Sequence, residues 1–218
     1  MVSFRAALDA GLDGLETDVH LTADGHLVLH HDPTLPGGHA IATMALADVR
    51  SLAPQVPLLE ELVALLDEFP AARVNLELKS AAPHRDDRAD ALSRALAGWR
   101  DTVRARVWLS TFDRQLLHEL DRGVRSRDLD VGLALLFSGS DDASVPTDVR
   151  LVAVHPHHAL VNRESVATWH AAGLAVHTWT VNEPVLARRL IEDGVDGLIG
   201  DVPEVLLAAR KQESTRGN

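Results

Sequence analysis

Cysteine is absent from this chain of 218 residues, which excludes disulfide bonds and thiolate chemistry. The sequence also lacks any apolar run of about 20 residues, the length that a membrane-spanning helix needs. Its N-terminus has no basic region followed by an apolar one, which is the pattern of a secretion signal. We therefore expect a cytoplasmic protein without a membrane span.

Positive charge is scarce, since 21 Lys and Arg stand against 32 Asp and Glu and the formal net charge is −11. Proteins that bind nucleic acid neutralise phosphates with clustered Lys and Arg, so we expect no nucleic-acid partner. An acidic enzyme that acts on an anionic small molecule needs local positive charge. A metal ion or a few placed side chains would supply it.

Apolar runs that read as strands alternate with helical patterns along the chain. Repeated strand–helix units predict an α/β fold with a mainly parallel sheet and helices outside it. We expect one domain at residues 1–209 and a frayed tail at 210–218, with Asn162 and Asn182 as N-caps of two late helices. The expected parallel strands are residues 14–19, 74–78, 107–109, 131–137, 151–154, 176–180 and 197–199.

The stretch GLETDVHLTADGHLVLHHDP, residues 14–33, predicts an antiparallel hairpin, because an Asp-Gly pair lies between two alternating apolar runs. A two-residue loop puts Asp18 opposite His31, whereas a four-residue loop puts Glu16 opposite His31. In either register Glu16, Asp18 and His31 share one face of the hairpin, since side chains alternate along a strand. His30 then points to the other face. The hairpin therefore predicts two carboxylates and one imidazole close together.

The stretch RVNLELKS carries Glu77 and Lys79 two residues apart on a strand, so they share a face. Like Glu16 and Asp18, they fall at the C-terminal end of a strand, where the active sites of α/β barrels lie. Three carboxylates at one rim repel each other unless a cation lies among them, and oxygen ligands suit Ca²⁺ or Mg²⁺ rather than Zn²⁺. The alternative is that Glu16 and Asp18 are solvated charges and Lys79 pairs with one of them.

These motifs together resemble the glycerophosphodiester phosphodiesterase family. The resemblance covers nearly the whole chain and rests on LETDVHLTADGHLVLHHDPTL, LELKS, LSTFD, VHTWTVNEP and GVDGLIGDVP, in the family's order. It implies a TIM-type (β/α)8 barrel of the phospholipase-C-like kind, with the hairpin as an excursion from it. It also implies an enzyme of lipid metabolism that hydrolyses a small-molecule glycerophosphodiester to an alcohol and sn-glycerol 3-phosphate.

The resemblance also implies roles for individual residues. Glu16, Asp18 and Glu77 would bind the metal ion, and Lys79 would contact the phosphate. His31 would act as general acid and base, oriented by Asp32, and Trp179 would pack against the alcohol moiety. The run HPHH at residues 155–158 is open to three readings, namely a solvated loop, a substrate contact or a second metal cluster.

The chain departs from the family pattern at its start, which lacks a first strand ending in His-Arg and a loop containing Pro-Glu-Asn. One imidazole then remains where the family has two, and acid–base assistance is worth about 10²- to 10⁴-fold, so we expect activity lowered by at least that factor. A truncated chain could have lost a secretion signal along with this segment. A barrel without its first strand exposes edges at residues 14–19 and 197–199, and a homodimer could shield them.

Two alternatives to the enzyme stay open. The first is a degenerate, non-catalytic barrel that binds a phosphodiester or a protein partner. The second is another barrel enzyme, such as an aldolase, with Lys79 as a Schiff-base lysine, but carboxylates beside Lys79 would hold it charged rather than nucleophilic.

Overall fold

Parallel strands alternate with helices in the computed structural model, which describes residues 1–79, 87–139 and 144–216. The chain divides into two compact units, and each is described by itself. Unit 1 consists of Met1–Leu8 and Asp13–Val131, and unit 2 of Asp9–Leu12 and Gly132–Asn218. No described helix has both the length and the apolar character needed to cross a membrane.

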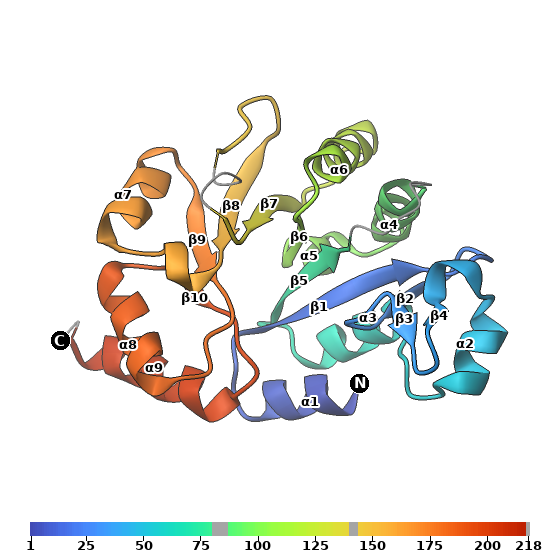
Figure 1. The fold of residues 1–218 in the computed structure, drawn as a ribbon, viewed down its shortest axis with the longest axis horizontal. Coiled ribbons are helices and arrows are strands. Elements are labelled where there is room, and N and C mark those ends of the chain that lie inside the picture. Colours follow the sequence, from blue (N-terminus) through green and yellow to red (C-terminus); the bar gives the residue numbers. More distant parts are fainter. Residues whose placement is uncertain (80–86, 140–143, 217–218) are drawn as a thin grey trace. The chain divides into compact units, whose positions relative to one another are not determined.

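Unit 1 is built around the strand order β6-β5-β1-β2, in which β1, β5 and β6 are parallel and β2 is antiparallel to β1. Figure 1 shows the long strand β1 next to β5. The elements of this unit are α1 (Val2–Asp9), β1 (Gly14–Leu21), β2 (Leu27–Leu29), β3 (Thr34–Leu35), β4 (His39–Ala40), η1 (Ile41–Thr43), α2 (Leu46–Leu52), α3 (Leu59–Glu68), β5 (Arg73–Leu78), α4 (Arg88–Ala97), α5 (Asp101–Arg104), β6 (Val107–Thr111) and α6 (Arg114–Ser126).

Unit 2 has the strand order β7-β8-β9-β10, and all of its strand pairs are parallel. Its elements are β7 (Gly132–Phe137), β8 (Leu151–Pro156), η3 (His158–Leu160), α7 (Arg163–Ala171), β9 (Ala175–Thr178), α8 (Pro184–Asp193), β10 (Gly197–Leu198) and α9 (Pro203–Arg216). Each strand predicted from the sequence is present with shifted ends, and the expected α/β class with a mainly parallel sheet is confirmed. Helix α9 extends into the expected tail, of which residues 217–218 lie outside the described part. The single domain at 1–209 stays a prediction.

The hairpin of β1 and β2 is antiparallel as predicted, but its register differs from both predicted registers. Val19 lies opposite Leu29 and Leu21 opposite Leu27. The loop is therefore three residues long rather than two or four. Such loops place a residue with positive φ at their last position, and Gly25 supplies it with φ +87°.

This shift by one residue exchanges the faces of the two histidines, because side chains alternate along a strand. Continued by one pair, the register places His30 opposite Asp18, and the N–H of His30 donates to the carbonyl oxygen of Asp18 at 3.1 Å. The expectation that strand pairing puts His31 on the face of Asp18 and His30 on the other face is therefore wrong. β2 ends at Leu29, so His31 lies beyond the regular ladder.

The segment after the hairpin, residues 33–57, forms a small lobe with its own apolar core (Figure 1). The lobe holds β2 through backbone contacts, since the N–H of Leu29 donates to the carbonyl of Pro57 at 2.9 Å and Val28 forms a bridge with Leu58. The buried residues of this core are Leu35, Ile41, Val49, Ala53 and Val56 of the lobe, together with Val28 of β2. The lobe thereby fixes the arm of the hairpin that leads to His30 and His31.

Of the two strand edges expected to be unpaired, at residues 14–19 and 197–199, the first is partly covered by β2. Val19–Leu21 of β1 pair with β2 in addition to the contact of β1 with β5. Among the described residues, β10 has β9 as its partner strand. The absence of a first strand and the homodimer that would shield the edges stay predictions.

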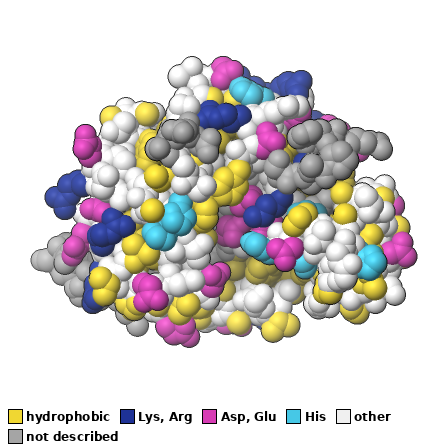
Figure 2. All heavy atoms as spheres, in the orientation of Figure 1, with side chains coloured by type: hydrophobic (Ala, Val, Ile, Leu, Met, Phe, Trp, Pro, Cys, Tyr) yellow, Lys and Arg dark blue, Asp and Glu magenta, His cyan; other side chains and the backbone are white. Residues whose placement is uncertain are grey.

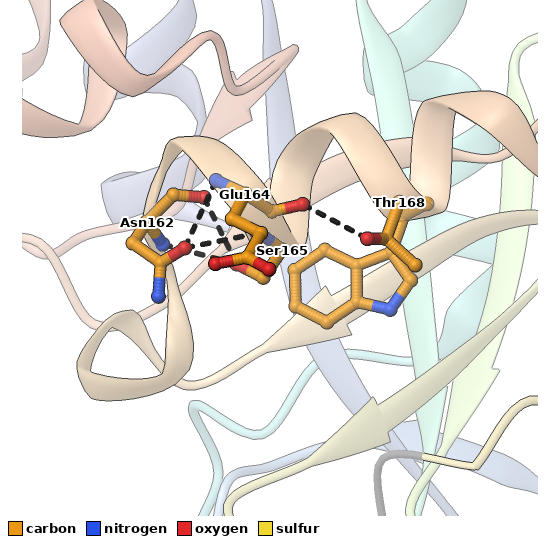
Figure 3. Close-up of a pocket in the computed structure, with 5 residues that line it drawn as sticks. Asn162, Glu164, Ser165 and Thr168 are labelled. Carbon is orange, nitrogen blue, oxygen red and sulfur yellow. Dashed lines mark hydrogen bonds between the residues drawn. The ribbon is translucent and has the colours of Figure 1, made fainter.

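Helix α7 begins at a side-chain cap, as predicted for Asn162 (Figure 3). The Asn162 side-chain oxygen accepts from the N–H groups of Glu164 and Ser165, each at 3.0 Å. These residues line a pocket together with Thr168 and Trp169. Because its polar groups largely bond one another within the helix start, we assign this pocket no ligand.

Asn182, in contrast, does not cap α8, whose N-cap is Glu183. The side-chain amide of Asn182 donates to the Asp201 carboxylate at 2.9 Å, and its oxygen accepts from the N–H of Asp201 at 2.7 Å. The cap prediction for Asn182 is therefore wrong, because the side chain joins two loops instead.

We expect Gly25→Ala to lower the free energy of unfolding by about 1 kcal/mol, since a Cβ disfavours positive φ. Urea unfolding measures this change. Gly98→Ala is the matched control, because Gly98 has φ −80° and an added Cβ there meets only the Ala95 carbonyl at 3.4 Å. Equal effects of the two substitutions would contradict the strained-turn explanation.

Candidate active site

Three carboxylates come together at the paired strands β1 and β5. The parallel register places Asp18 opposite Glu77, and Glu16 lies two residues before Asp18 on the same face. One oxygen atom from each of the three side chains lies within 4.8 Å of the other two. The structure therefore brings together the three residues that the sequence analysis proposed as metal ligands.

Lys79 lies directly beside this cluster. Its Nζ is 3.0 Å from Asp18 Oδ1 and 3.0 Å from Glu77 Oε1. Figure 2 shows acidic, basic and histidine side chains together over the ends of β1 and β5. The ion pair considered from the sequence is thus present, and it includes Glu77 as well as Asp18.

The pKa values of this group reflect burial and mutual charge. Burial raises the pKa of Asp18 and of Glu77, although the charge of Lys79 acts in the opposite direction; the charge of Asp18 raises the pKa of Glu77 further. Burial acts to lower the pKa of Lys79, but the charges and hydrogen bonds of Glu77 and Asp18 outweigh it and raise that pKa. Lys79 therefore stays protonated, which disfavours a Schiff-base role.

The donor set fits a hard divalent cation. Three carboxylates and one ammonium group leave two negative charges in excess when all are ionised. All three potential ligand atoms are carboxylate oxygens, which Ca²⁺ and Mg²⁺ prefer. These residues could therefore hold a divalent metal ion.

His31 follows the end of β2, and its side chain is 80% exposed. Its Nδ1 lies 2.9 Å from Asp32 Oδ1, so the carboxylate orients the ring as the sequence analysis proposed. Burial raises the pKa of Asp18 and of Glu77, and the charge of His31 is a smaller influence in the opposite direction. His30 is half-buried, and its Nδ1 lies 2.8 Å from the carbonyl oxygen of Asp32.

Sequence reasoning missed His20, the third polar residue of β1 on the face of Glu16 and Asp18. Its side chain is buried, with a residue exposure of 4%. Burial lowers the pKa of His20 to about 4. The alternation of side chains along β1 could have identified His20, because residues 16, 18 and 20 share one face of a strand.

Trp179 lies in unit 2, immediately after the end of β9, and is half-buried. Its indole N–H donates to the carbonyl oxygen of His155 at 2.9 Å, and its ring meets that of His157 edge to face with centroids 5.0 Å apart. His155 is fully buried, with Nε2 3.1 Å from Nδ1 of His177. Within the described part of the chain these histidines form no cluster of three that could hold a metal ion.

Comparison with known proteins identifies the class of this chain. The model of the Glycerophosphoryl diester phosphodiesterase family matches residues 1–205. The chain therefore belongs to this family of phosphoric diester hydrolases, as the resemblance of its motifs predicted.

Individual relatives agree with this assignment. A glycerophosphodiester phosphodiesterase of Caldanaerobacter subterraneus subsp. tengcongensis is 27% identical over 222 residues, which cover 95% of this chain and 89% of the relative. A crystal structure from Silicibacter pomeroyi, assigned to the glycerophosphoryl diester phosphodiesterases, is 28% identical with a TM-score of 0.80, and the match covers 95% of this chain and 86% of that one.

The fold is also that of an Oleispira antarctica phosphodiesterase solved in complex with the product sn-glycerol-3-phosphate. That structure has a TM-score of 0.80 at 22% identity, and the match covers 96% of this chain and 90% of that one. Together the family and the solved structures confirm an α/β fold of the TIM-barrel type.

We expect the free energy of unfolding to fall as the pH drops below about 6.5, in part because of His155. Burial lowers the pKa of His155 well below 6.5, with the charge of His177 as a second cause, so below pH 6.5 the unfolded chain binds a proton that the folded chain resists. One such group contributes at most about 1.4 kcal/mol per pH unit. Urea unfolding of wild type and His155→Gln from pH 7.5 to 5 tests this, and parallel curves would contradict it.

Proposed function

We propose that this chain hydrolyses glycerophosphodiesters to an alcohol and sn-glycerol 3-phosphate, with Ca²⁺ or Mg²⁺ held by Glu16, Asp18 and Glu77. One observation carries the proposal: in a chain of this family, three carboxylate oxygens on neighbouring parallel strands lie within 4.8 Å of one another. The product named in the Oleispira antarctica structure supports the choice of reaction.

When bound, the cation supplies positive charge that offsets the negative charge of the phosphodiester. Lys79 adds a second positive contact. An ammonium group has three N–H donors, and Asp18 and Glu77 lie close enough to accept two of them. The third donor is then available for a non-bridging phosphate oxygen, and the raised pKa keeps Lys79 charged.

His31 exchanges the protons of the reaction. Its Nδ1 is held by Asp32, which leaves Nε2 as the nitrogen that accepts a proton. Nε2 takes a proton from the attacking water as the new P–O bond forms, and a proton is returned to the alcohol oxygen when its bond to phosphorus breaks. The exposed ring of His31 is accessible to both water and substrate.

The contact of Trp179 with the alcohol moiety stays a prediction from the sequence. Its indole N–H is fixed on the His155 carbonyl, which holds the ring in one orientation. A half-buried indole combines a rigid apolar face with a satisfied polar edge.

The cytoplasmic location and the homodimer remain predictions from the sequence.

The rival function, a non-catalytic barrel that binds a phosphodiester, shares the carboxylate cluster and differs in turnover. Metal binding without release of glycerol 3-phosphate would favour that rival.

Release of glycerol 3-phosphate from glycerophosphocholine and glycerophosphoethanolamine tests the proposed reaction, with Ca²⁺, with Mg²⁺ and with chelator. We expect turnover that needs the metal and falls at least about 10²-fold in Glu16→Ala, because the site loses an ionic ligand. Glu60→Ala removes an exposed glutamate of α3 and should leave turnover unchanged. Full activity with chelator, or in Glu16→Ala, would overturn the proposal.

The variant Lys79→Met tests whether Lys79 contacts the phosphate without contributing to metal binding. We expect turnover to fall about 10²- to 10³-fold, since a charge that stabilises the transition state is lost. Metal affinity in titration calorimetry should stay equal or become tighter, because the ammonium group no longer competes for Asp18 and Glu77. Weaker metal binding in Lys79→Met would show that this electrostatic assignment is wrong.

A further inference from the structure

One buried polar side chain beside the carboxylate cluster has no role in the proposed chemistry. Asn75, on β5, is 6% exposed. Its amide nitrogen donates to the Ser110 hydroxyl at 2.9 Å, whereas Oδ1 accepts no hydrogen bond from the described part of the chain. A buried acceptor without a donor costs free energy, and nearly all buried polar groups have a partner. This oxygen therefore requires a partner other than the described residues.

The strand pairing shows where Asn75 lies. Side chains alternate along β5, so Asn75 and Glu77 share one face. The parallel register places Asn75 opposite Glu16 on β1, two residues before the pair of Asp18 and Glu77. Asn75 is thus the cross-strand neighbour of Glu16, on the face that carries all three carboxylates.

The hydrogen bond to Ser110 sets the direction of the amide group. Strand β5 lies between β6 and β1 (Figure 1), and Ser110 belongs to β6. The amide nitrogen of Asn75 is therefore directed toward β6. Because nitrogen and oxygen diverge from the amide carbon, Oδ1 is directed toward β1 and its carboxylates. Ionised carboxylates only accept hydrogen bonds, so they cannot satisfy this oxygen.

A divalent cation is a partner that suits both the amide oxygen and the carboxylates. Ca²⁺ takes about six to eight oxygen ligands, which include carboxylates and the side-chain carbonyl of Asn. The three carboxylates and the ammonium group of Lys79 leave two negative charges in excess when all are ionised, and a divalent cation balances them. A neutral amide oxygen adds a ligand without changing this balance.

We propose that Asn75 Oδ1 is a fourth protein ligand of the cation, held in its orientation by the hydrogen bond to Ser110. This inference rests on the proposed function, which places the cation at Glu16, Asp18 and Glu77. Ser110 is a positioning residue, since it acts on the cation only through the amide of Asn75.

Calorimetric titration with Ca²⁺ tests the ligand. Asn75→Leu keeps a side chain of similar size without the oxygen, and we expect the Kd for Ca²⁺ to rise about 10-fold. Asn75→Asp keeps the oxygen and adds a negative charge, so its Kd should be lower than that of wild type. Ser110→Ala removes the partner of the amide and should raise the Kd by a smaller factor than Asn75→Leu.

Thr17→Val is the matched control. Thr17 is buried on β1 between Glu16 and Asp18, but its side chain lies on the opposite face of the strand. The Kd for Ca²⁺ should therefore equal that of wild type. Urea unfolding in the presence of chelator shows that each variant is folded before it is titrated.

Terbium luminescence distinguishes a ligand from a side chain that only supports the carboxylates. Tb³⁺ is a hard cation that takes oxygen ligands as Ca²⁺ does, and its luminescence lifetimes in H₂O and D₂O give the number of water molecules bound to it. We expect about one more bound water in Asn75→Leu than in wild type, because water replaces Oδ1 in the coordination shell. An amide turned the other way, with its nitrogen toward a carboxylate, would leave this number unchanged.

An unchanged number of waters, or a Kd for Ca²⁺ equal to wild type in folded Asn75→Leu, would overturn the proposal. If Asn75→Leu does not fold, Asn75→Asp decides, and a Kd equal to or higher than that of wild type overturns it. Failure of the proposed function gives a different pattern. Wild type that binds Ca²⁺ without turnover refutes the hydrolysis, while the series of Kd values still decides the role of Asn75. Wild type that binds neither Ca²⁺ nor Mg²⁺ refutes the metal site, and this inference with it.

Discussion

The excess of negative charge where β1 pairs with β5 is the constraint on which the rest of the site depends. The parallel register places Asp18 opposite Glu77, and Glu16 follows on the same face. Burial raises the pKa of both paired carboxyls, and Lys79 offsets only part of their charge. Burying these carboxylates costs free energy when no cation is present. The positive charge of a cation would also favour the approach of a negatively charged phosphodiester.

The hairpin and its lobe carry His31, the proposed proton-transfer group, and leave its side chain exposed. The apolar core around Val28 and Ile41 fixes β2, while β2 itself is only three residues long. His31 therefore emerges exposed at the end of a fixed arm, where Asp32 orients its ring. A hydrogen bond from the buried Arg88 side chain to the carbonyl oxygen of Lys79 holds the backbone at the end of β5.

Sequence reasoning predicted the carboxylates and the lysine correctly as neighbours because their relations are local. Glu16 and Asp18, like Glu77 and Lys79, are two residues apart on a strand, and the period of two decides their face. The predicted register of the hairpin, in contrast, was wrong, although it was also argued from neighbouring residues. A loop of three residues ending at Gly25, rather than two or four, moves every side chain of the second arm to the opposite face, and an Asp-Gly pair does not distinguish these loop lengths.

The sequence by itself determined the α/β class, the family and the residues with chemistry at strand ends, because periodicity and motif order are properties of neighbouring positions. Only the tertiary structure decided that Asp18 meets Glu77, that Lys79 bridges both of them, and that His20 and Arg88 are buried. The contacts of Asp18 with Glu77 and with Lys79 join segments about 60 residues apart in the sequence. Their geometry depends on strand register and on packing, which no local pattern specifies.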